Sequence, residues 1–525
     1  MMERPQCLAD ASVSATRSQS RTARRVALRH GPLLALVCSV ASWSCSSDDV
    51  SPGATPPVYT PPNTSPDAPP DTAPNGPQGN AGSGGGTDVP PGNEGNVIPS
   101  RPIATDSDAG VTNPSGDADS GGAGSVDPEP PVVCDILPNN GSLTDGDANI
   151  DLASELQRIS GFGGMDGGFY PELTAAQVDT AFGNGQGQMG LSIIRIRVPE
   201  ARDRFGTSLA AASRASALGA TVMATPWTPP ANLKSNNSTV GGSLNVASYG
   251  AYADHLLAFR DFMQQNGVPL YAISVQNEPD IRVDYESCDW TANQLIDWIT
   301  AHGSKFGDTR LMAPESFNFN RQVSDPILNN PAASAQVDIV AGHIYGNGLA
   351  DYPLARQQGK EVWMTEHYTD SANPANQWPL ALDVGTEIHN IMSANFSAYV
   401  WWAIRRAYGL MTEDGVVSKR GYLVAQYSKF IRPGFVRVRT TQPNNQNVGV
   451  TAYKGENDEV VVVALNRSAQ PQTINLDVFN SCATTFSRFT TSQTKNVNAD
   501  GQVTLTERRA SVTLDGQSVT TFVSQ

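Results

Sequence analysis

Eight short apolar segments, each followed by a stretch with helical periodicity, lie between residues 158 and 433 and constrain the fold most strongly. A short apolar run bounded by polar residues is typical of a strand in a parallel sheet that helices cover on both faces. Eight strand–helix units over about 270 residues match the size of one closed α/β barrel. We therefore predict a (β/α)8 TIM barrel with strands at residues 161–164, 192–198, 221–226, 271–277, 309–314, 337–345, 362–366 and 397–404.

An open, doubly wound sheet is the main alternative for alternating strands and helices. Such a sheet binds nucleotides through a G-x-G-x-x-G loop after its first strand. Residues 161–168 read Gly-Phe-Gly-Gly-Met-Asp-Gly-Gly, which does not fit that loop, and no suitable acidic residue follows. The sequence therefore argues against nucleotide binding, and we expect no cofactor.

Residues 434–525 change to β character, with alternating or β-branched residues at 436–440, 448–453, 459–464, 473–476, 511–514 and 518–523. These segments predict a small β-sandwich. Residues 148–159, before the barrel, also have strand character, so we expect the lead-in at 134–157 to contribute a strand to the sandwich. The sandwich would then be a side domain fixed to the barrel, which spans residues 158–433.

The first 133 residues have no pattern of a folded domain. Residues 1–45 resemble an export signal, with a basic start and an apolar core at 33–41 that is too short to span a bilayer. Cys45 follows small residues, as in a bacterial lipobox, although Trp43 fits poorly; plain secretion is the alternative. Residues 46–133 are rich in Pro, Gly, Ser, Thr and Asp, which predicts a disordered acidic linker. We expect a secreted or outer-surface protein whose only membrane attachment is a lipidated Cys45.

Charge and cysteine usage exclude several classes of function. The net charge of −16 would repel phosphates, which argues against a nucleic-acid partner. The six cysteines show no C-x-x-C spacing, which argues against a zinc or redox site. Cys134 and Cys482 are candidates for a disulfide if the two ends of the folded region meet, and Cys288 would then be free. We expect a monomer.

Two predicted strands end in a carboxylate. One ends at Asn277-Glu278-Pro279, and the other at Glu366, which His367 and Tyr368 follow. Active-site groups of α/β barrels lie at the carboxyl ends of the strands. Glycoside hydrolysis needs two carboxyl groups, one protonated and one ionised, and Asn277 would place a donor amide beside the acid. The sequence therefore predicts a glycoside hydrolase with Glu278 and Glu366 as its catalytic pair.

Several other residues compete for a role in this site. Glu278 alone could form a surface ion pair, and Glu315 ends the fifth strand as Glu366 ends the seventh. Glu200 and Asp166, near strands two and one, are interpreted as hydrogen-bonding residues. His343 and His367 each lack a second ligand at metal-binding spacing. We therefore interpret them as histidines that are hydrogen-bonded within the site, and we expect no metal.

Aromatic residues and one arginine pair stand near predicted strand ends, where they could contact sugar rings. Trp401 and Trp402 are adjacent, so one should face the barrel interior and the other the helices. Of Arg405 and Arg406, only one should point into the cleft, where its guanidinium would suit a carboxylate; an ion pair with Glu413 or Asp414 is the alternative. The other candidate aromatics are Trp227, Trp290, Tyr345, Tyr368 and Tyr408.

Six motifs in order resemble glycoside hydrolase family 30, in particular its bacterial glucuronoxylan-cleaving subfamily. They are Gly-Phe-Gly-Gly-Met (161–165), Thr-Pro-Trp-Thr-Pro-Pro (225–230), Ser-Val-Gln-Asn-Glu-Pro-Asp (274–280), Gly-His-Ile-Tyr-Gly (342–346), Trp-Met-Thr-Glu-His-Tyr (363–368) and Ser-Lys-Arg-Gly-Tyr (418–422). The resemblance covers the barrel and extends to the sandwich. It implies a retaining endo-β-1,4-xylanase, with Glu278 as acid/base and Glu366 as nucleophile.

The resemblance also implies that a 4-O-methylglucuronic acid branch of xylan is held by Tyr368, Ser371, Trp402, Arg406 and Tyr408. Three positions depart from the family pattern: Asn232 replaces an aromatic residue, Ala403 a tyrosine and Asp166 an asparagine. The change at Asn232 could weaken binding of the xylose backbone. The alternatives are another family 30 activity, on unsubstituted xylan or β-glucosides, and a non-catalytic carbohydrate-binding lipoprotein. Intact Arg406 and Tyr408 argue against the first alternative, and both glutamates argue against the second.

Overall fold

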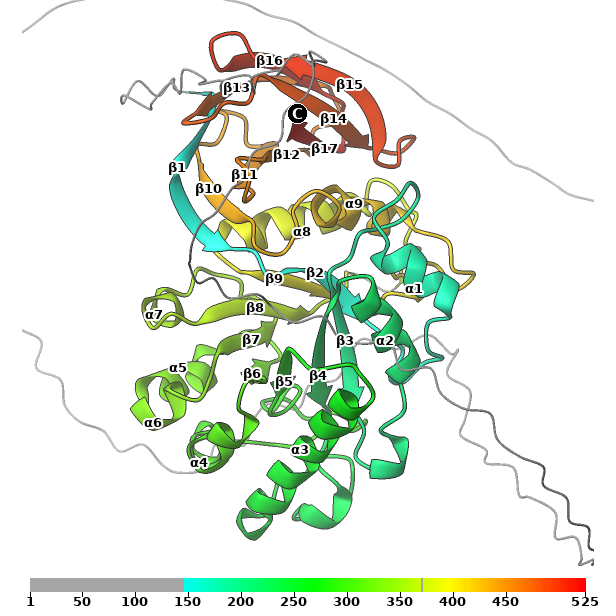
Figure 1. The fold of residues 1–525 in the computed structure, drawn as a ribbon, viewed down its shortest axis with the longest axis vertical. Coiled ribbons are helices and arrows are strands. Elements are labelled where there is room, and N and C mark those ends of the chain that lie inside the picture. The colour runs from blue at the N-terminus through cyan, green and yellow to red at the C-terminus, as the bar shows by residue number, and fades with distance from the viewer. Residues whose placement is uncertain (1–145, 370–371) are drawn as a thin grey trace, which may run out of the picture. The chain divides into compact units, whose positions relative to one another are not determined.

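The structure is a computed structural model that describes residues 146–369 and 372–525. Eight parallel strands form a closed barrel in sequence order, and the last of them pairs with the first (Figure 1). The predicted fold class is therefore confirmed. The barrel strands are β2 (Gly161–Met165), β3 (Ile193–Val198), β4 (Thr221–Pro226), β5 (Ala272–Ser274), β6 (Arg310–Ser316), β7 (Ile339–His343), β8 (Glu361–Glu366) and β9 (Ala398–Trp401).

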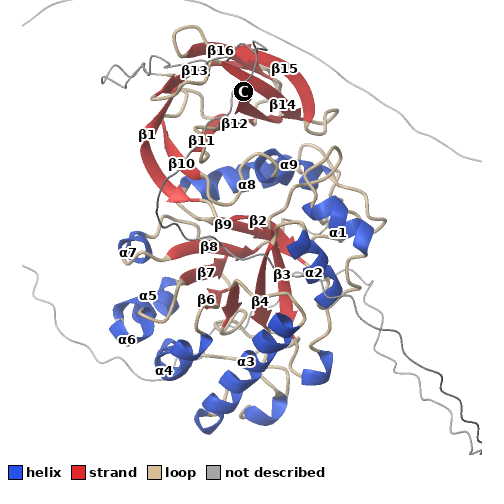
Figure 2. Cartoon of the chain, viewed as in Figure 1, coloured by secondary structure: helices blue, strands red, loops and turns tan. Residues whose placement is uncertain are grey.

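Helices alternate with these strands and surround the barrel (Figure 2). Two of them begin with a capping box, in which a threonine and a glutamine three residues later each accept a hydrogen bond from the other's backbone: Thr174 with Gln177 and Thr291 with Gln294. The helices are α1 (Ala175–Phe182), α2 (Leu209–Ala217), α3 (Tyr249–Gln265), α4 (Ala292–His302), α5 (Arg321–Asn329), α6 (Pro331–Ser334), α7 (Pro353–Gln357), α8 (Leu382–Ser393) and α9 (Lys419–Ser428), with short 3-10 turns at Arg202–Arg204, Ala231–Leu233, Val246–Ser248 and Gly303–Phe306.

Alternation along the barrel strands separates two apolar layers. In β8, Val362 and Met364 belong to the large core between strands and helices, whereas Trp363 belongs to a smaller cluster with inward residues of the other strands. Successive side chains of a strand point to opposite faces, which explains this division. This apolar cluster fills the barrel interior below the carboxyl ends of the strands, where Glu315, His343 and Glu366 are buried.

The fourth predicted strand, at 271–277, is longer than the observed β5, which ends at Ser274. Beyond it the chain is held by single backbone hydrogen bonds, from Asn277 N to Pro226 O (2.8 Å) and from Glu278 N to Glu315 O (2.9 Å). Glu278 has a φ of 44°, in the left-handed region that strands do not use. The ladder therefore stops early because the chain turns at the barrel mouth.

The sandwich is one nine-stranded sheet in the order β15-β14-β17-β12-β11-β10-β1-β13-β16, curled around a single apolar core. Strand β1 precedes the barrel in sequence, yet it lies between β10 (antiparallel) and β13 (parallel). Strands β14 and β15 were not among the predicted segments. The strands are β1 (Ala148–Arg158), β10 (Val436–Thr440), β11 (Val448–Lys454), β12 (Val460–Asn466), β13 (Gln472–Phe479), β14 (Thr485–Thr491), β15 (Asn498–Thr504), β16 (Arg509–Leu514) and β17 (Ser518–Ser524).

Helices α8 and α9 lie between the barrel strands and the sandwich (Figure 1). Val463, Leu465 and Val519 of the sandwich belong to the same apolar core as the barrel helices. The hydroxyl of Thr521 in β17 donates to the backbone oxygen of Gln426 in α9 (2.7 Å). The two parts thus share a continuous buried core.

Several expectations concern residues outside the described part of the chain: the signal at 1–45 with Cys45, the linker at 46–133, Cys134 and Ser371. Cys482 is disulfide-bonded, whereas Cys288 is buried with a free thiol. Among the described residues, none of the helices combines the length and the apolar character that a bilayer span requires.

Candidate active site

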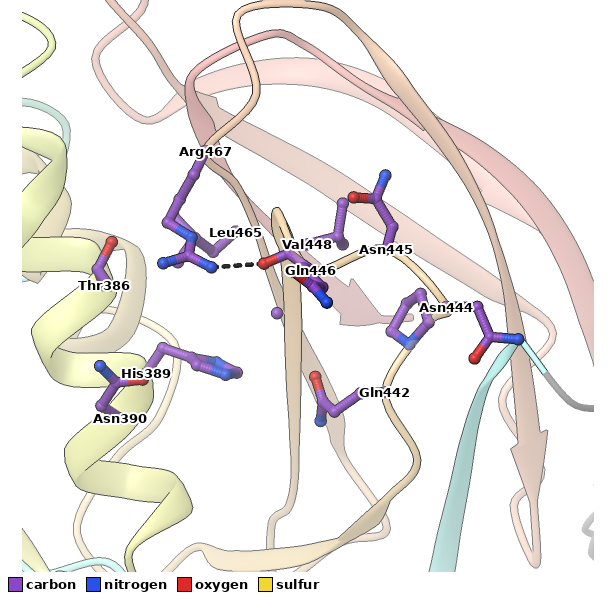
Figure 3. A pocket seen from close by; sticks show the side chains of 12 residues that line it. Thr386, His389, Asn390, Gln442, Asn444, Asn445, Gln446, Val448, Leu465 and Arg467 are labelled. Carbon is purple, nitrogen blue, oxygen red and sulfur yellow. Dashed lines mark hydrogen bonds between the residues drawn. The ribbon is translucent and has the colours of Figure 1, made fainter.

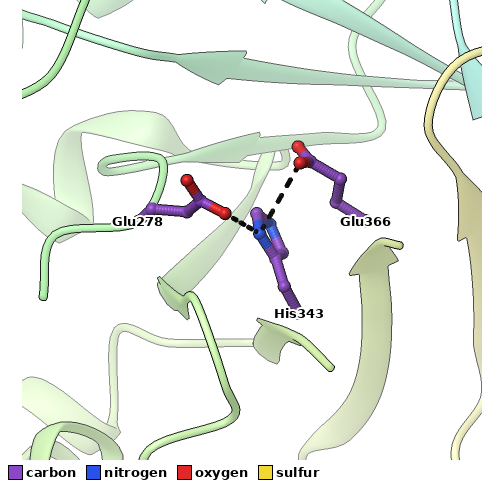
Figure 4. Close-up of side chains that lie close together, drawn as sticks. All are labelled: Glu278, His343 and Glu366. Carbon is purple, nitrogen blue, oxygen red and sulfur yellow. Dashed lines mark hydrogen bonds and ion pairs between the residues drawn. The ribbon is translucent and has the colours of Figure 1, made fainter. Parts of the chain in front are cut away.

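Glu278 and Glu366 meet at the mouth of the barrel with His343 between them (Figure 4). Glu366 is the last residue of β8, His343 is the last of β7, and Glu278 follows β5. One oxygen of each carboxylate and one nitrogen of His343 lie within 4.8 Å of one another. His343 Nδ1 is 2.8 Å from Glu278 Oε1 and 4.0 Å from Glu366 Oε1. The structure therefore brings together the two carboxylates that the sequence predicted.

Beneath this pair, Arg195 of β3 is fully buried and contacts three of the site's polar side chains. Its guanidinium forms an ion pair with Glu366 Oε2, donates to Asn277 Oδ1 (2.7 Å) and lies 3.4 Å from Glu315 Oε1. Because a guanidinium has only donors, Asn277 must turn its carbonyl oxygen toward Arg195. The amide nitrogen of Asn277 then remains as the donor for another group.

Arg195 was not predicted, although the sequence contained a signal for it. The strand Ile-Ile-Arg-Ile-Arg-Val places a charged residue where every neighbour is buried. A buried charge is stable only when it is paired and hydrogen-bonded. An arginine inside a buried barrel strand therefore indicates acidic partners at the same end of the barrel.

The electrostatics of the cluster differ from residue to residue. Burial raises the pKa of Glu278, against the opposing effect of its hydrogen bond with His343. Burial also acts to raise the pKa of Glu315, but Arg195 and His343 outweigh it and lower that pKa to about 2. Burial acts to lower the pKa of His343, but the surrounding carboxylates outweigh it and raise that pKa to about 9. Burial thus favours the protonated form of Glu278, whereas Arg195 and His343 favour the ionised form of Glu315.

The trio of Glu278, His343 and Glu366 is also compact enough to contact one metal ion. A metal ligand must be deprotonated, however, and the raised pKa of His343 favours its protonated form. Glu366 is further engaged by Arg195 and by the hydroxyl of Tyr345, which donates to Glu366 Oε1 (3.0 Å). The chemistry of these groups fits a hydrogen-bonded network better than a metal centre.

Two groups of aromatic rings adjoin the carboxylates and their partners. The rings of Tyr345, Tyr368 and Tyr408 follow one another, with centroids 5.4 Å and 4.9 Å apart. Trp227 and Trp402 lie 5.7 Å apart, and Arg195 contacts the face of Trp227. These five residues, all candidates from the sequence, form two aromatic walls.

The two neighbouring tryptophans point in opposite directions, as the alternation predicted. Trp401 is fully buried in the core between the strands and the helices. Trp402 instead packs with Met165 and Trp227 above the barrel interior. Only Trp402 is therefore placed to contact a ligand.

The two adjacent arginines also differ. Arg405 donates to Gln177 Oε1 (3.0 Å) and Pro171 O (2.8 Å). The Arg406 guanidinium lies over the Tyr170 ring at 3.8 Å, and 5.9 Å from the centroid of Tyr408. It is also 3.6 Å from Glu413. Arg406 therefore lies beside the aromatic wall, as predicted, and also approaches Glu413, which was the alternative.

Two tyrosines near these groups were not predicted. The hydroxyl of Tyr285 donates to Glu278 Oε2 (3.3 Å), and Tyr170 supports Arg406. Tyr285 follows Glu278 by seven residues in a loop, so no strand or helix periodicity pointed to it. Tyr170 is also in a loop. Both contacts depend on loop conformations that local sequence patterns do not specify.

The remaining candidates have partners away from the two carboxylates. Trp290 is buried, and its Nε1 donates to Gln276 Oε1 (3.3 Å). Glu200 pairs with Arg197 (2.8 Å), and His367 lies 2.7 Å from Glu387. Asp166 accepts a hydrogen bond from Leu173 N (3.1 Å). These contacts assign the four residues to supporting structure.

A closed α/β barrel with two buried carboxylates and aromatic walls at its mouth defines the protein as a glycoside hydrolase. Residues 207–362 match the glycosyl hydrolase family 30 TIM-barrel domain, and residues 434–522 match the family's beta sandwich domain. The chain belongs to glycoside hydrolase family 30, which confirms the resemblance seen in its motifs.

The relatives agree with this assignment. The chain is 44% identical over 393 residues to glucuronoxylanase XynC of Bacillus subtilis (strain 168), covering 73% of this chain and 92% of that protein. Among solved structures, the family 30 subfamily 8 xylanase Xyn30A of Clostridium acetobutylicum is similar, with a TM-score of 0.67, 38% identity, and coverage of 73% of this chain and 100% of the other. A family 30 endoxylanase of Clostridium papyrosolvens C71 has a TM-score of 0.66, 36% identity, and coverage of 72% and 100%.

Proposed function

We propose that the protein is a retaining endo-β-1,4-xylanase that cleaves glucuronoxylan at positions set by the 4-O-methylglucuronic acid branch. The pairing of Glu278 and Glu366 at the barrel mouth is the observation that carries the hydrolytic part of the proposal. The xylan part is supported by the relatives, one a glucuronoxylanase and two xylanases by name.

The distance between the carboxylates supports a retaining mechanism. Retaining enzymes hold their two carboxyl groups about 5–5.5 Å apart, whereas inverting enzymes leave about 6.5–9.5 Å for a water molecule. One oxygen of Glu278 and one of Glu366 lie within 4.8 Å, which leaves little room for that water. Glu366 is therefore proposed as the nucleophile and Glu278 as the acid/base.

In the first step, Glu366 attacks the anomeric carbon while Glu278 gives its proton to the leaving oxygen. The bond from Glu366 to the sugar replaces the glycosidic bond. In the second step, water attacks that carbon, Glu278 takes the water proton, and Glu366 leaves as a carboxylate. Arg195 and Tyr345 hold Glu366 in place through its two oxygens, and the Asn277 amide nitrogen can donate to the sugar 2-hydroxyl.

The branch is proposed to bind beside Arg406. A guanidinium can pair with a carboxylate through two parallel hydrogen bonds. Tyr368, Trp402 and Tyr408 surround this position in the aromatic walls, and Ser371 is the fifth proposed member, outside the described residues. Contact with the branch would fix which backbone bond reaches Glu278 and Glu366.

Mass spectrometry of the products from glucuronoxylan tests this proposal. We expect each product to carry one uronic acid at a fixed distance from its reducing end. Proton NMR of the first product should show the β-anomer, because configuration is retained. Products cut independently of the branches would contradict the specificity, and an initial α-anomer would contradict the nucleophile assignment. Hydrolysis of linear, unbranched xylan is the control.

A further inference from the structure

A cavity of about 510 Å³ lies between α8 and the sandwich (Figure 3). We call it the junction pocket. Its lining comes from one face of α8, the loop between β10 and β11, and the facing ends of β11 and β12. The lining residues are Thr386, His389, Asn390, Gln442, Pro443, Asn444, Asn445, Gln446, Val448, Gly449, Leu465 and Arg467.

The junction pocket has a positively charged residue and no acidic one in its described lining. The whole chain has a net charge of −16, yet none of the twelve described residues that line the pocket is Asp or Glu. Arg467 supplies a permanent positive charge. A neighbouring cavity of about 350 Å³ shares Thr386 and Asn390 but includes Asp383 and Glu387. An anionic ligand would therefore enter the larger cavity and not its neighbour.

His389 provides a fixed polar group in the pocket. Its ring lies against Gly449, where an added Cβ would come within 2.7 Å of two ring atoms. Its Nδ1 is buried and makes no hydrogen bond with any described residue. Burial, together with Arg467 and Arg437, lowers the pKa of His389 to about 4, so the imidazole is neutral at ordinary pH. The imidazole therefore adds no second charge to the pocket, and its packing on Gly449 fixes this part of the lining.

The polar groups in the pocket fit a ligand with many hydroxyls and one carboxylate. A polyphosphate would need several cations, and Arg467 is the only permanent one among the lining residues. The side-chain amides of Asn390 and Gln446 make no hydrogen bond within the described chain and can bind hydroxyls. The described lining contains no Phe, Tyr or Trp, so recognition would use hydrogen bonds to a branch or chain end and not stacking on a large ring.

We propose that the junction pocket is a non-catalytic binding site for an acidic oligosaccharide, here the uronate-bearing part of branched xylan, with Arg467 on the carboxylate. The choice of xylan rests on the proposed function. The pocket would hold the polymer on the side of the enzyme while the barrel cleaves a separate stretch.

The test uses the full chain with Glu366→Gln, so that the polymer stays intact, and measures depletion of protein by insoluble glucuronoxylan. Arg467→Ala should weaken binding about 3- to 10-fold, since an exposed charge-assisted contact is lost. Arg467→Lys should restore part of the loss, because lysine keeps the charge without the paired geometry. Arg439→Ala changes an exposed residue of β10 outside the pocket; it is the matched control and should bind as the parent does. Linear unbranched xylan should show little dependence on Arg467.

The outcomes separate the two proposals. If Arg467→Ala binds glucuronoxylan as the parent does, the proposed binding site in the junction pocket is wrong and the proposed function is unaffected. Equal losses on branched and linear xylan would overturn the assignment of Arg467 to a carboxylate. If the protein with Glu366 intact does not hydrolyse glucuronoxylan while Arg467-dependent binding persists, the proposed function fails and the pocket stands. In the protein with Glu366 intact, Arg467→Ala should also slow hydrolysis of insoluble polymer more than hydrolysis of a short soluble oligosaccharide.

Discussion

Replacing Arg406 with alanine tests the proposed recognition of the uronate branch. The guanidinium lies on Tyr170 at 3.8 Å, and its side chain is 31% exposed. Hydrogen bonds to charged groups contribute about 1.5–3 kcal/mol. Partial exposure and the competing contact with Glu413 place Arg406 at the lower end, about 1.5–2 kcal/mol. Arg406→Ala should therefore lower kcat/KM on glucuronoxylan about 10- to 30-fold.

Variants of neighbouring residues define the source of this loss. Tyr170→Ala removes only the ring under the guanidinium and should lower kcat/KM about 2- to 5-fold on the same substrate. Arg406→Lys should recover part of the loss, because an ammonium cannot form the paired contact. Arg405→Ala is the matched control, since Arg405 is bound to Gln177 and Pro171 O. It should act equally on branched and linear substrates.

The assay compares initial rates on glucuronoxylan and on linear xylan for each variant. The effect of Arg406→Ala should be confined to glucuronoxylan, because linear xylan offers no carboxylate. Equal losses on both substrates, with a lowered melting temperature, would refute the reasoning. Arg406 would then support the fold through Tyr170 and Glu413, and the preference for branched xylan would need another explanation.

Three other predictions concern the proton donor, the buried histidine and the N-terminal cysteine. Glu278→Ala should lower kcat on xylan about 100- to 10,000-fold. On a substrate with an activated aryl leaving group, which departs without a proton donor, azide should raise turnover by attacking the sugar bound to Glu366; absence of the azide product there would contradict the acid/base role. The folded pKa of His343, about 9, lies above its ordinary value of 6.5, so its stabilising effect is complete below pH 6.5 and is lost as pH rises toward 9. Between pH 6.5 and 9 the melting temperature should fall less for His343→Gln than for the parent. If the melting temperatures of both proteins change equally with pH, the ion-paired state of His343 is contradicted. If Cys45 is lipidated, as we propose, the native protein should partition into detergent and Cys45→Ser should be released to the medium; native protein already in the medium would favour plain secretion.

The sequence was sufficient for the barrel and the carboxylate pair because both depend on local patterns. Apolar runs locate the strands, and topology then brings Glu278 and Glu366 to the same end of the barrel. Arg195 was missed although a charged residue in a buried strand was a signal for it. Tyr170 and Tyr285 were missed because their contacts depend on loop conformations that follow no strand or helix periodicity. Strand β15 was missed for another reason: Asn498–Thr504 is an exposed edge strand with almost no apolar alternation. Its conformation depends on pairing with β14, and its own residues have little preference for a strand.

Strand β1 has a consequence for how the chain reaches its native state. It is synthesised before the barrel, but its two neighbours in the sheet, β10 and β13, follow the barrel. Asn149 and Thr441, hydrogen-bonded across the first of these contacts, are 292 positions apart. Non-local pairing of this kind slows folding, because a long loop must close before the contact forms. The sandwich can therefore close only after nearly the whole chain has been translated, and a ribosome-bound chain that stops after α9 would expose both edges of β1 to aggregation or to chaperones.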